Sequence, residues 1–140
     1  MKTIETIPAL VGANHRNLPE SVALVAPQRS PLAYKDLQKH LHAIGTQLHA
    51  LGIGSGDRVA VSLPNGPEMA ATFLAVTQVA ACAPLNPNYR EAECDFYLSD
   101  LAPKALIARA GVAEAAQRVA RQQGIPVLTL TVNPDCAAGE

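Results

Sequence analysis

Charge of one sign, paired cysteines and long apolar runs are all scarce in this sequence, and each scarcity argues against a class of function. Eleven lysines and arginines balance twelve aspartates and glutamates, for a net charge of −1 at pH 7. No basic surface for nucleic acid or for an anionic membrane is therefore predicted. Cys82, Cys94 and Cys136 are odd in number and form no C-x-x-C pair. They indicate reduced thiols in a cytoplasmic protein, and not a disulfide framework or a zinc ribbon.

No segment is predicted to cross a membrane or to direct secretion. The longest apolar stretch, residues 69–83, is interrupted by Thr72, Thr77 and Gln78 and is too short to span a bilayer. The N-terminus lacks the continuous apolar core of a signal peptide. With 49% hydrophobic and 16% charged residues among 140, the chain has the composition and length of one globular domain.

The order of the predicted elements indicates an α/β fold. An apolar stripe of period 3–4 runs from Tyr34 to Leu51, through Leu37, Leu41, Ile44 and Leu48, and predicts a helix that Gly52 ends. Further helices are expected at residues 68–80, 90–101 and 112–123, with strands at 22–26, 58–63, 82–85, 104–108 and 127–132. Such alternation is typical of a parallel sheet flanked by helices on both faces. Residues 133–140 are interpreted as a linker.

Two helices carry further expectations. The helix at 68–80 has hardly any polar face, so we expect it to be enclosed on most sides, and a chain of this length to leave part of it open. The open face predicts self-association. The helix at 90–101 is expected to bury Cys94, Tyr97, Leu98 and Leu101 on one side.

The glycine cluster at residues 52–56 is the first candidate for a phosphate site. A phosphate loop follows a strand and opens a helix, whereas these glycines follow a helix and lead into a strand. We therefore interpret them as a helix cap and a turn. The turn at residues 64–67 has the right order, but Pro67 has no N–H and Glu68 places a negative charge there, which favours a structural role.

Titratable clusters are the next candidates. His40, His42 and His49 share one helix at spacings that do not converge on one ion, and we interpret them as solvated helix surface. Glu91, Glu93 and Asp95 lie early in a helix, where acids complement its dipole. No serine has a nucleophile-elbow context. The residues therefore predict no catalytic, cofactor-binding or metal-binding residue within 1–140.

Taken in order, a set of short motifs resembles the N-terminal part of AMP-forming acyl-CoA synthetases, in the adenylate-forming superfamily. The resemblance covers residues 22–107 and rests on these runs: Tyr34 with Asp36-Leu37; Leu51-Gly52; Gly56-Asp57-Arg58-Val59-Ala60; Leu63-Pro64-Asn65; Ala83-Pro84-Leu85-Asn86-Pro87; Tyr89-Arg90; and Phe96-Tyr97-Leu98-Ser99-Asp100. The last runs look most like the branch of oxalate–CoA ligases and related peroxisomal CoA synthetases. Two departures are Ala33, where the family usually has a capping threonine, and Ala80-Ala81, where it usually has glycine.

The resemblance implies an activity for a longer protein. In such enzymes a carboxylate and Mg-ATP give an acyl-adenylate and pyrophosphate, and the thiol of CoA then displaces AMP. The phosphate loop, the nucleotide-binding acid and the catalytic lysine of the family have no counterpart in this sequence. The resemblance therefore implies that residues 1–140 are an incomplete N-terminal subdomain of a truncated chain, an inactive scaffold that binds none of ATP, Mg and CoA by itself. Its expected partner is the remainder of the synthetase or a second copy.

Two alternatives stay open at this point. One is a stand-alone flavodoxin-like module that binds a small molecule or a protein at the carboxyl ends of its strands. The other is a non-catalytic remnant that regulates or dimerises with a full-length synthetase.

Overall fold

A four-stranded parallel sheet in the order β4-β3-β5-β6 forms the centre of the protein. The structure is a computed structural model, and it describes residues 5–140. The strands are β3 (Arg58–Ser62), β4 (Ala81–Pro84), β5 (Ala105–Arg109) and β6 (Val127–Leu130). Val59 of β3 is in register with Cys82 on one side and with Ala105 on the other.

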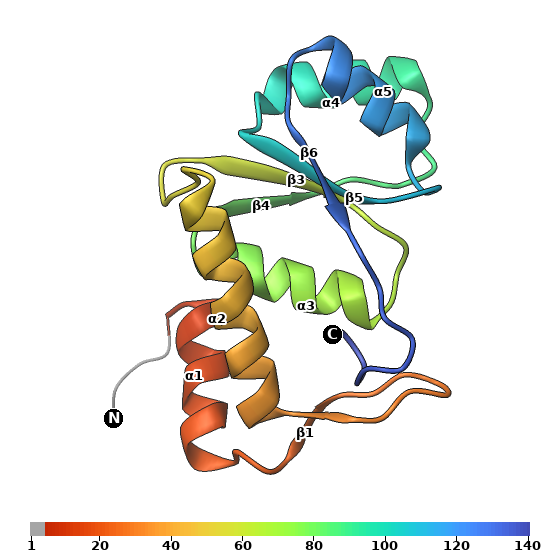
Figure 1. The fold of residues 1–140 in the computed structure, drawn as a ribbon. Coiled ribbons are helices and arrows are strands. Elements are labelled where there is room, and N and C mark those ends of the chain that lie inside the picture. Colours follow the sequence, from red (N-terminus) through yellow and green to blue (C-terminus); the bar gives the residue numbers. More distant parts are fainter. Residues whose placement is uncertain (1–4) are drawn as a thin grey trace.

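Helices cover both faces of this sheet, which confirms the predicted α/β class (Figure 1). On one face lie α2 (Tyr34–Ala50) and α3 (Pro67–Val76), and on the other lie α4 (Glu91–Leu101) and α5 (Glu114–Gln122). Alternate residues of each strand point to opposite faces. Val59 and Val61 therefore pack under α2 and α3, whereas Ala60 and Leu106 pack under α4 and α5.

The predicted apolar stripe of α2 is confirmed along the helix but not at its end. Leu41 and Leu48 are buried, and Ile44 is half-buried between two cores. Leu51, expected in the stripe, follows the helix and is 57% exposed. The helix ends there because Gly52 takes a left-handed φ of +76°, a conformation that glycine adopts without strain.

At the N-terminus the sequence predicted only the strand at residues 22–26, and the structure adds a helix and the second strand of a hairpin. Helix α1 (Ile7–Asn17) packs beside α2, and β1 (Val22–Leu24) pairs antiparallel with β2 (Leu32–Ala33). Thr6 caps α1, because its hydroxyl oxygen accepts a hydrogen bond of 3.2 Å from the N–H of Ala9. Together these elements and α2 enclose a third core that contains Val11, Leu32 and Leu37.

Three expected details are corrected by the structure. Helix α3 ends at Val76 and not at residue 80, because i→i−3 hydrogen bonds such as that from the N–H of Val79 to Val76 close a tight turn. Helix α5 begins at Glu114, since Ala113 is left-handed. On α4, Cys94 and Leu98 are buried as expected, but Tyr97 lies at the surface.

Helix α3 is better covered than its sequence predicts. Ala71, Ala75 and Val76 are buried, and Leu74 is half-buried. The large exposed apolar side chains lie on other elements, the most exposed being Val25 in the hairpin. The prediction that α3 presents an open apolar face is therefore wrong.

The last eight residues, expected to be a linker, pack against the body of the protein. Ala138 is fully buried, and its N–H donates a hydrogen bond of 2.9 Å to the carbonyl of Ser30 in the hairpin. A linking role within a longer chain stays a prediction. Among the helices of residues 5–140, none has the length and apolar character needed to cross a bilayer.

Candidate functional site

The glycine cluster forms a cap and a turn, as predicted. Gly52 ends α2, and the N–H of Gly54 donates a hydrogen bond of 2.9 Å to the carboxylate of Asp57. The N–H of Asp57 donates in return to the carbonyl of Gly54, also at 2.9 Å. The Gly54 N–H is therefore already bonded to the Asp57 carboxylate. In a phosphate loop, such an N–H would be free to bind the ligand.

The three histidines of α2 point to different surroundings. His42 and His49 are exposed, as predicted, whereas His40 is half-buried. The Nδ1 atom of His49 lies 3.0 Å from the carbonyl oxygen of Ile53, a backbone contact. Within residues 5–140, no three side chains of histidine, cysteine, aspartate or glutamate gather closely enough to hold a metal ion.

The acidic residues of α4 cap the beginning of the helix and form surface contacts, in agreement with the structural role predicted for them. The carboxylate of Glu93 accepts a hydrogen bond of 2.9 Å from the N–H of Arg90, the residue before the helix. Glu91 pairs with Arg118 of α5 at 2.7 Å, an exposed contact between the two helices.

The strongest candidate site is a recess of about 830 Å³ beyond the carboxyl ends of three neighbouring strands. Parallel α/β sheets bind ligands at this edge, where consecutive connections leave in opposite directions. Here β3 lies between β4 and β5, so the sheet has such a switch point. The recess is lined by Leu63, Pro64 and Asn65 after β3, by Pro84 and residues 85–88 at the end of β4, by Gly111, Val112 and Ala113 after β5, and by Met69 of α3.

The chemistry of this recess favours binding over catalysis. Its polar side chains are the amides of Asn65, Asn86 and Asn88. The Asn86 side-chain oxygen accepts a hydrogen bond of 2.9 Å from the N–H of Asn88 and holds that loop. Because no acid, base, hydroxyl or thiol lines it, the recess can contact a ligand but supplies neither a proton carrier nor a nucleophile.

Two of the thiols, those of Cys82 and Cys94, are also unsuited to nucleophilic chemistry. Burial raises the pKa of the Cys82 thiol to about 11. The pKa of the Cys94 thiol is also raised, first by burial and then by the charge of Glu93. Both thiols are therefore protonated at neutral pH, and the thiolate is the reactive form.

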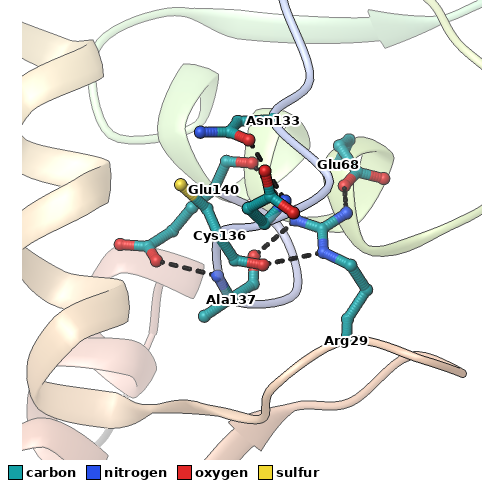
Figure 2. Close-up of polar contacts among 7 residues, drawn as sticks. Arg29, Glu68, Asn133, Cys136, Ala137 and Glu140 are labelled. Atoms are coloured by element: carbon teal, nitrogen blue, oxygen red, sulfur yellow. Dashed lines mark hydrogen bonds and ion pairs between the residues drawn. The ribbon is translucent and has the colours of Figure 1, made fainter.

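A contact that the sequence did not reveal joins three distant segments. Arg29, in the β1–β2 loop, donates a hydrogen bond of 2.8 Å to the Glu68 carboxylate on α3 (Figure 2). The same guanidinium donates to the carbonyl oxygens of Cys136 at 2.8 Å and Ala137 at 2.6 Å. The sequence carries no signal for these contacts, since the partners are up to 111 residues apart and three are backbone oxygens, that of Glu140 at 3.4 Å being the third.

Comparison with known proteins identifies relatives of this chain. The sequence profile of the AMP-binding enzyme family matches residues 12–139. The chain is 38% identical over 95 residues to an oxalate–CoA ligase of Saccharomyces cerevisiae, covering 62% of the chain and 18% of the relative. It is 32% identical over 130 residues to an oxalate–CoA ligase of Arabidopsis thaliana, covering 91% of the chain and 25% of the relative.

The fold has close counterparts among solved structures. The ATP-bound structure of MatB from Rhodopseudomonas palustris superimposes with a TM-score of 0.79 at 24% identity, over 96% of this chain and 26% of that one. The chain therefore spans a quarter or less of the length of the two ligases and about a quarter of that structure.

Proposed function

The chain belongs to the family of AMP-binding enzymes, and from this premise we propose that it is an N-terminal scaffold segment of an ATP-dependent acyl-CoA synthetase. The whole enzyme would convert a carboxylic acid, ATP and CoA to acyl-CoA, AMP and pyrophosphate through an acyl-adenylate. The family match over residues 12–139 carries this proposal, and the identity to two oxalate–CoA ligases supports it. Oxalate or another small carboxylic acid is the proposed substrate, and the cytoplasm the proposed compartment.

We further propose that residues 1–140 form an N-terminal subdomain that is inactive by itself. Three features support this: the glycine cluster is a turn, the Cys82 and Cys94 thiols are protonated at neutral pH, and the recess offers no proton carrier. Since no carboxylate lines the recess, its residues do not fit Mg²⁺, which prefers oxygen ligands that include carboxylates. Nucleotide, metal and catalysis are assigned to the remainder of the synthetase, the proposed partner of this segment.

The recess is the part of the segment best suited to contact a substrate. Three amides among proline, leucine, methionine and valine side chains match an uncharged group that carries amides of its own. Among the substrates of a CoA ligase, the pantetheine arm of CoA has this chemistry, whereas the triphosphate of ATP does not. We therefore propose that the recess contributes to the CoA side of the reaction.

The test measures the two half-reactions separately in the presence and absence of the remaining chain. Residues 1–140 alone should give no carboxylate-dependent exchange of pyrophosphate into ATP. The synthetase that contains them should give this exchange with a small carboxylic acid. Exchange by the fragment alone would refute the scaffold role.

Substitution in the recess then tests the CoA assignment. Within the complete enzyme, Asn65→Ala should raise the KM for CoA and leave pyrophosphate exchange unchanged, because exchange does not require CoA. Ser55→Ala, in the turn after α2, is the matched control on a loop outside the recess. An unchanged KM for CoA in Asn65→Ala would contradict this part of the proposal.

A further inference from the structure

The outer side of β6 is an open edge of the sheet. β6 pairs with β5 on one side, and no strand among residues 5–140 pairs with its other side. The N–H of Leu106 on β5 donates a hydrogen bond of 2.9 Å to the carbonyl of Pro126. Because the backbone groups of successive residues in a strand point to opposite sides, the even-numbered residues face β5. Val127, Thr129 and Thr131 therefore present their N–H and C=O groups outward.

The opposite edge of the sheet, formed by β4, is protected against a further strand. The N–H of Ala81 donates a hydrogen bond of 3.0 Å to the carbonyl of Asp57 beside β3, so Cys82 and Pro84 are the outward residues of β4. Proline has no N–H, and its place in a sheet is typically an edge where pairing stops. None of the outward residues at β6 is a proline. The β6 edge therefore keeps the donors that a further strand needs.

A recess of about 570 Å³ lies beside the β6 edge, on the face of the sheet that α2 and α3 cover. Burial on this face falls toward the edge: Val59 of β3 is fully buried, Ile107 of β5 is 6% exposed, and Leu128 of β6 is half-buried. Leu51, which is 57% exposed, also lines the recess. The apolar layer of this face is therefore incomplete beside β6.

An extended chain fits this place better than a helix does. The outward N–H and C=O groups recur at every second residue, and an added strand would bond to all of them. A helix would leave them unbonded, because it uses its own backbone groups internally.

The remainder of the synthetase is the occupant that the structure favours. The chain spans a quarter or less of the two ligases that it resembles. Its residues 139 and 140 line the same recess, and Figure 1 shows the chain leaving β6 and turning back to end beside α3. A segment that continues from Glu140 would be tethered at the recess, at an effective concentration of about millimolar. A second copy at micromolar concentration would compete poorly with it.

We propose that an extended segment of the synthetase beyond residue 140 adds to the β6 edge as a fifth strand. The inference rests on the proposed function, because it requires a longer chain. Side chains alternate between the two faces of a strand, so every second residue of the added segment points toward the recess. These residues should be apolar, since they complete the layer that contains Leu51 and Leu128.

Amide hydrogen exchange, resolved to single residues, tests the strand addition in the complete synthetase and in residues 1–140. The amides of Thr129 and Thr131 should exchange at least about a hundredfold more slowly in the complete synthetase. The amide of Leu128 faces β5 and is the internal reference, which should be slow in both. Equal exchange of the Thr129 amide in the two proteins would overturn the proposal. Protection in residues 1–140 alone that rises with protein concentration would assign the edge to a second copy, and would also overturn it.

A pair of substitutions at one exposed position gives a second measurement. Thr129→Pro removes an outward N–H, whereas the matched control Thr129→Ala keeps it. Proline is tolerated at an open edge but not between two paired strands. The urea midpoint should therefore fall from Thr129→Ala to Thr129→Pro by more in the complete synthetase than in residues 1–140. An equal fall in both would contradict the added strand.

The activity of the unsubstituted synthetase separates this inference from the proposed function. Carboxylate-dependent exchange of pyrophosphate into ATP, together with a rapidly exchanging Thr129 amide, would refute the added strand alone. A complete chain that lacks this exchange would refute the proposed function, whatever the state of the β6 edge.

Discussion

The Arg29 guanidinium lies 2.8 Å from the Glu68 carboxylate, and this ion pair joins the β1–β2 loop to the first turn of α3. Both side chains are largely buried, with exposed fractions of 12% and 19%. Because the same guanidinium also binds two carbonyl oxygens of residues 136–137, one side chain holds three segments in place. Arg29 therefore stabilises the packing of three segments that are distant in the sequence, although it lies in a short loop.

Replacement of Arg29 by alanine should destabilise the protein and release its last residues. The substitution leaves the Glu68 carboxylate and two carbonyl oxygens without their donor, which we expect to cost about 1–3 kcal/mol. Urea unfolding measures the loss, and amide hydrogen exchange should accelerate at residues 133–140 first. Lys104→Ala, which removes a cation 3.8 Å from Asp57 at the surface, should change the unfolding free energy by less than about 0.5 kcal/mol. Equal exchange at 133–140 in both variants would contradict the role of Arg29.

Gly139→Ala should also loosen the C-terminal segment, for a steric reason. Gly139 has a φ of +92°, and a Cβ atom there would lie 3.0 Å from Cδ1 of Leu24 and 3.1 Å from the carbonyl oxygen of Pro67. We expect a cost of about 1–3 kcal/mol in unfolding free energy. Gly54→Ala is the control, because no atom lies within 4 Å of its Cβ position and its φ is not left-handed. Equal melting temperatures of the two variants would show that the space around Gly139 does not require glycine.

The Cys82 thiol should make stability fall at high pH. Its pKa is raised to about 11 in the folded protein from 9.0, so between these values the unfolded chain loses a proton that the folded chain keeps. The unfolded state is then favoured progressively as pH rises from 9 to 11, and the effect is absent below pH 9. Urea unfolding at pH 8, 9.5 and 10.5 measures it.

Cys82→Ala should flatten this pH dependence, whereas Cys136→Ala serves as the matched thiol control. Alkylation supplies a second measurement, because the thiolate is the reactive species. Cys82 should react slowly at pH 8 in the folded protein and faster as the pH approaches 11. If the unfolding free energy of Cys82→Ala falls with pH as steeply as that of the unsubstituted protein, another group causes the effect.

Self-association stays a prediction, but the structure favours a surface on α4 for it and not the helix α3. Helix α3 is covered, whereas Phe96 on α4 is 66% exposed and contacts Tyr97, whose ring in turn stacks on Tyr89. An exposed aromatic cluster of this kind favours association. Sedimentation at micromolar concentration should show a species larger than the monomer, and Phe96→Ser should reduce it. A monomer in both cases would show that this surface does not drive association.

Local patterns were sufficient to predict most of the sheet and its helices. The spacing of Leu37, Leu41 and Leu48 predicted α2, because a helix with one buried face must repeat its apolar residues every three or four positions. The end of α2 at Gly52 followed from backbone chemistry, since glycine adopts a positive φ without strain. The ordered motifs predicted the family, and the profile match over residues 12–139 confirms it.

Contacts between distant segments decided the rest. The sequence of α3 did not reveal that its apolar sides are covered within this chain, because coverage depends on how α2 and the C-terminal residues pack against it. The Arg29 contacts likewise join residues that no local pattern relates. The sequence thus determined the elements from residue 34 onward, their order and the family, whose signals are periodic and local. Tertiary structure alone decided which side chains meet, because that depends on the folded path of the chain.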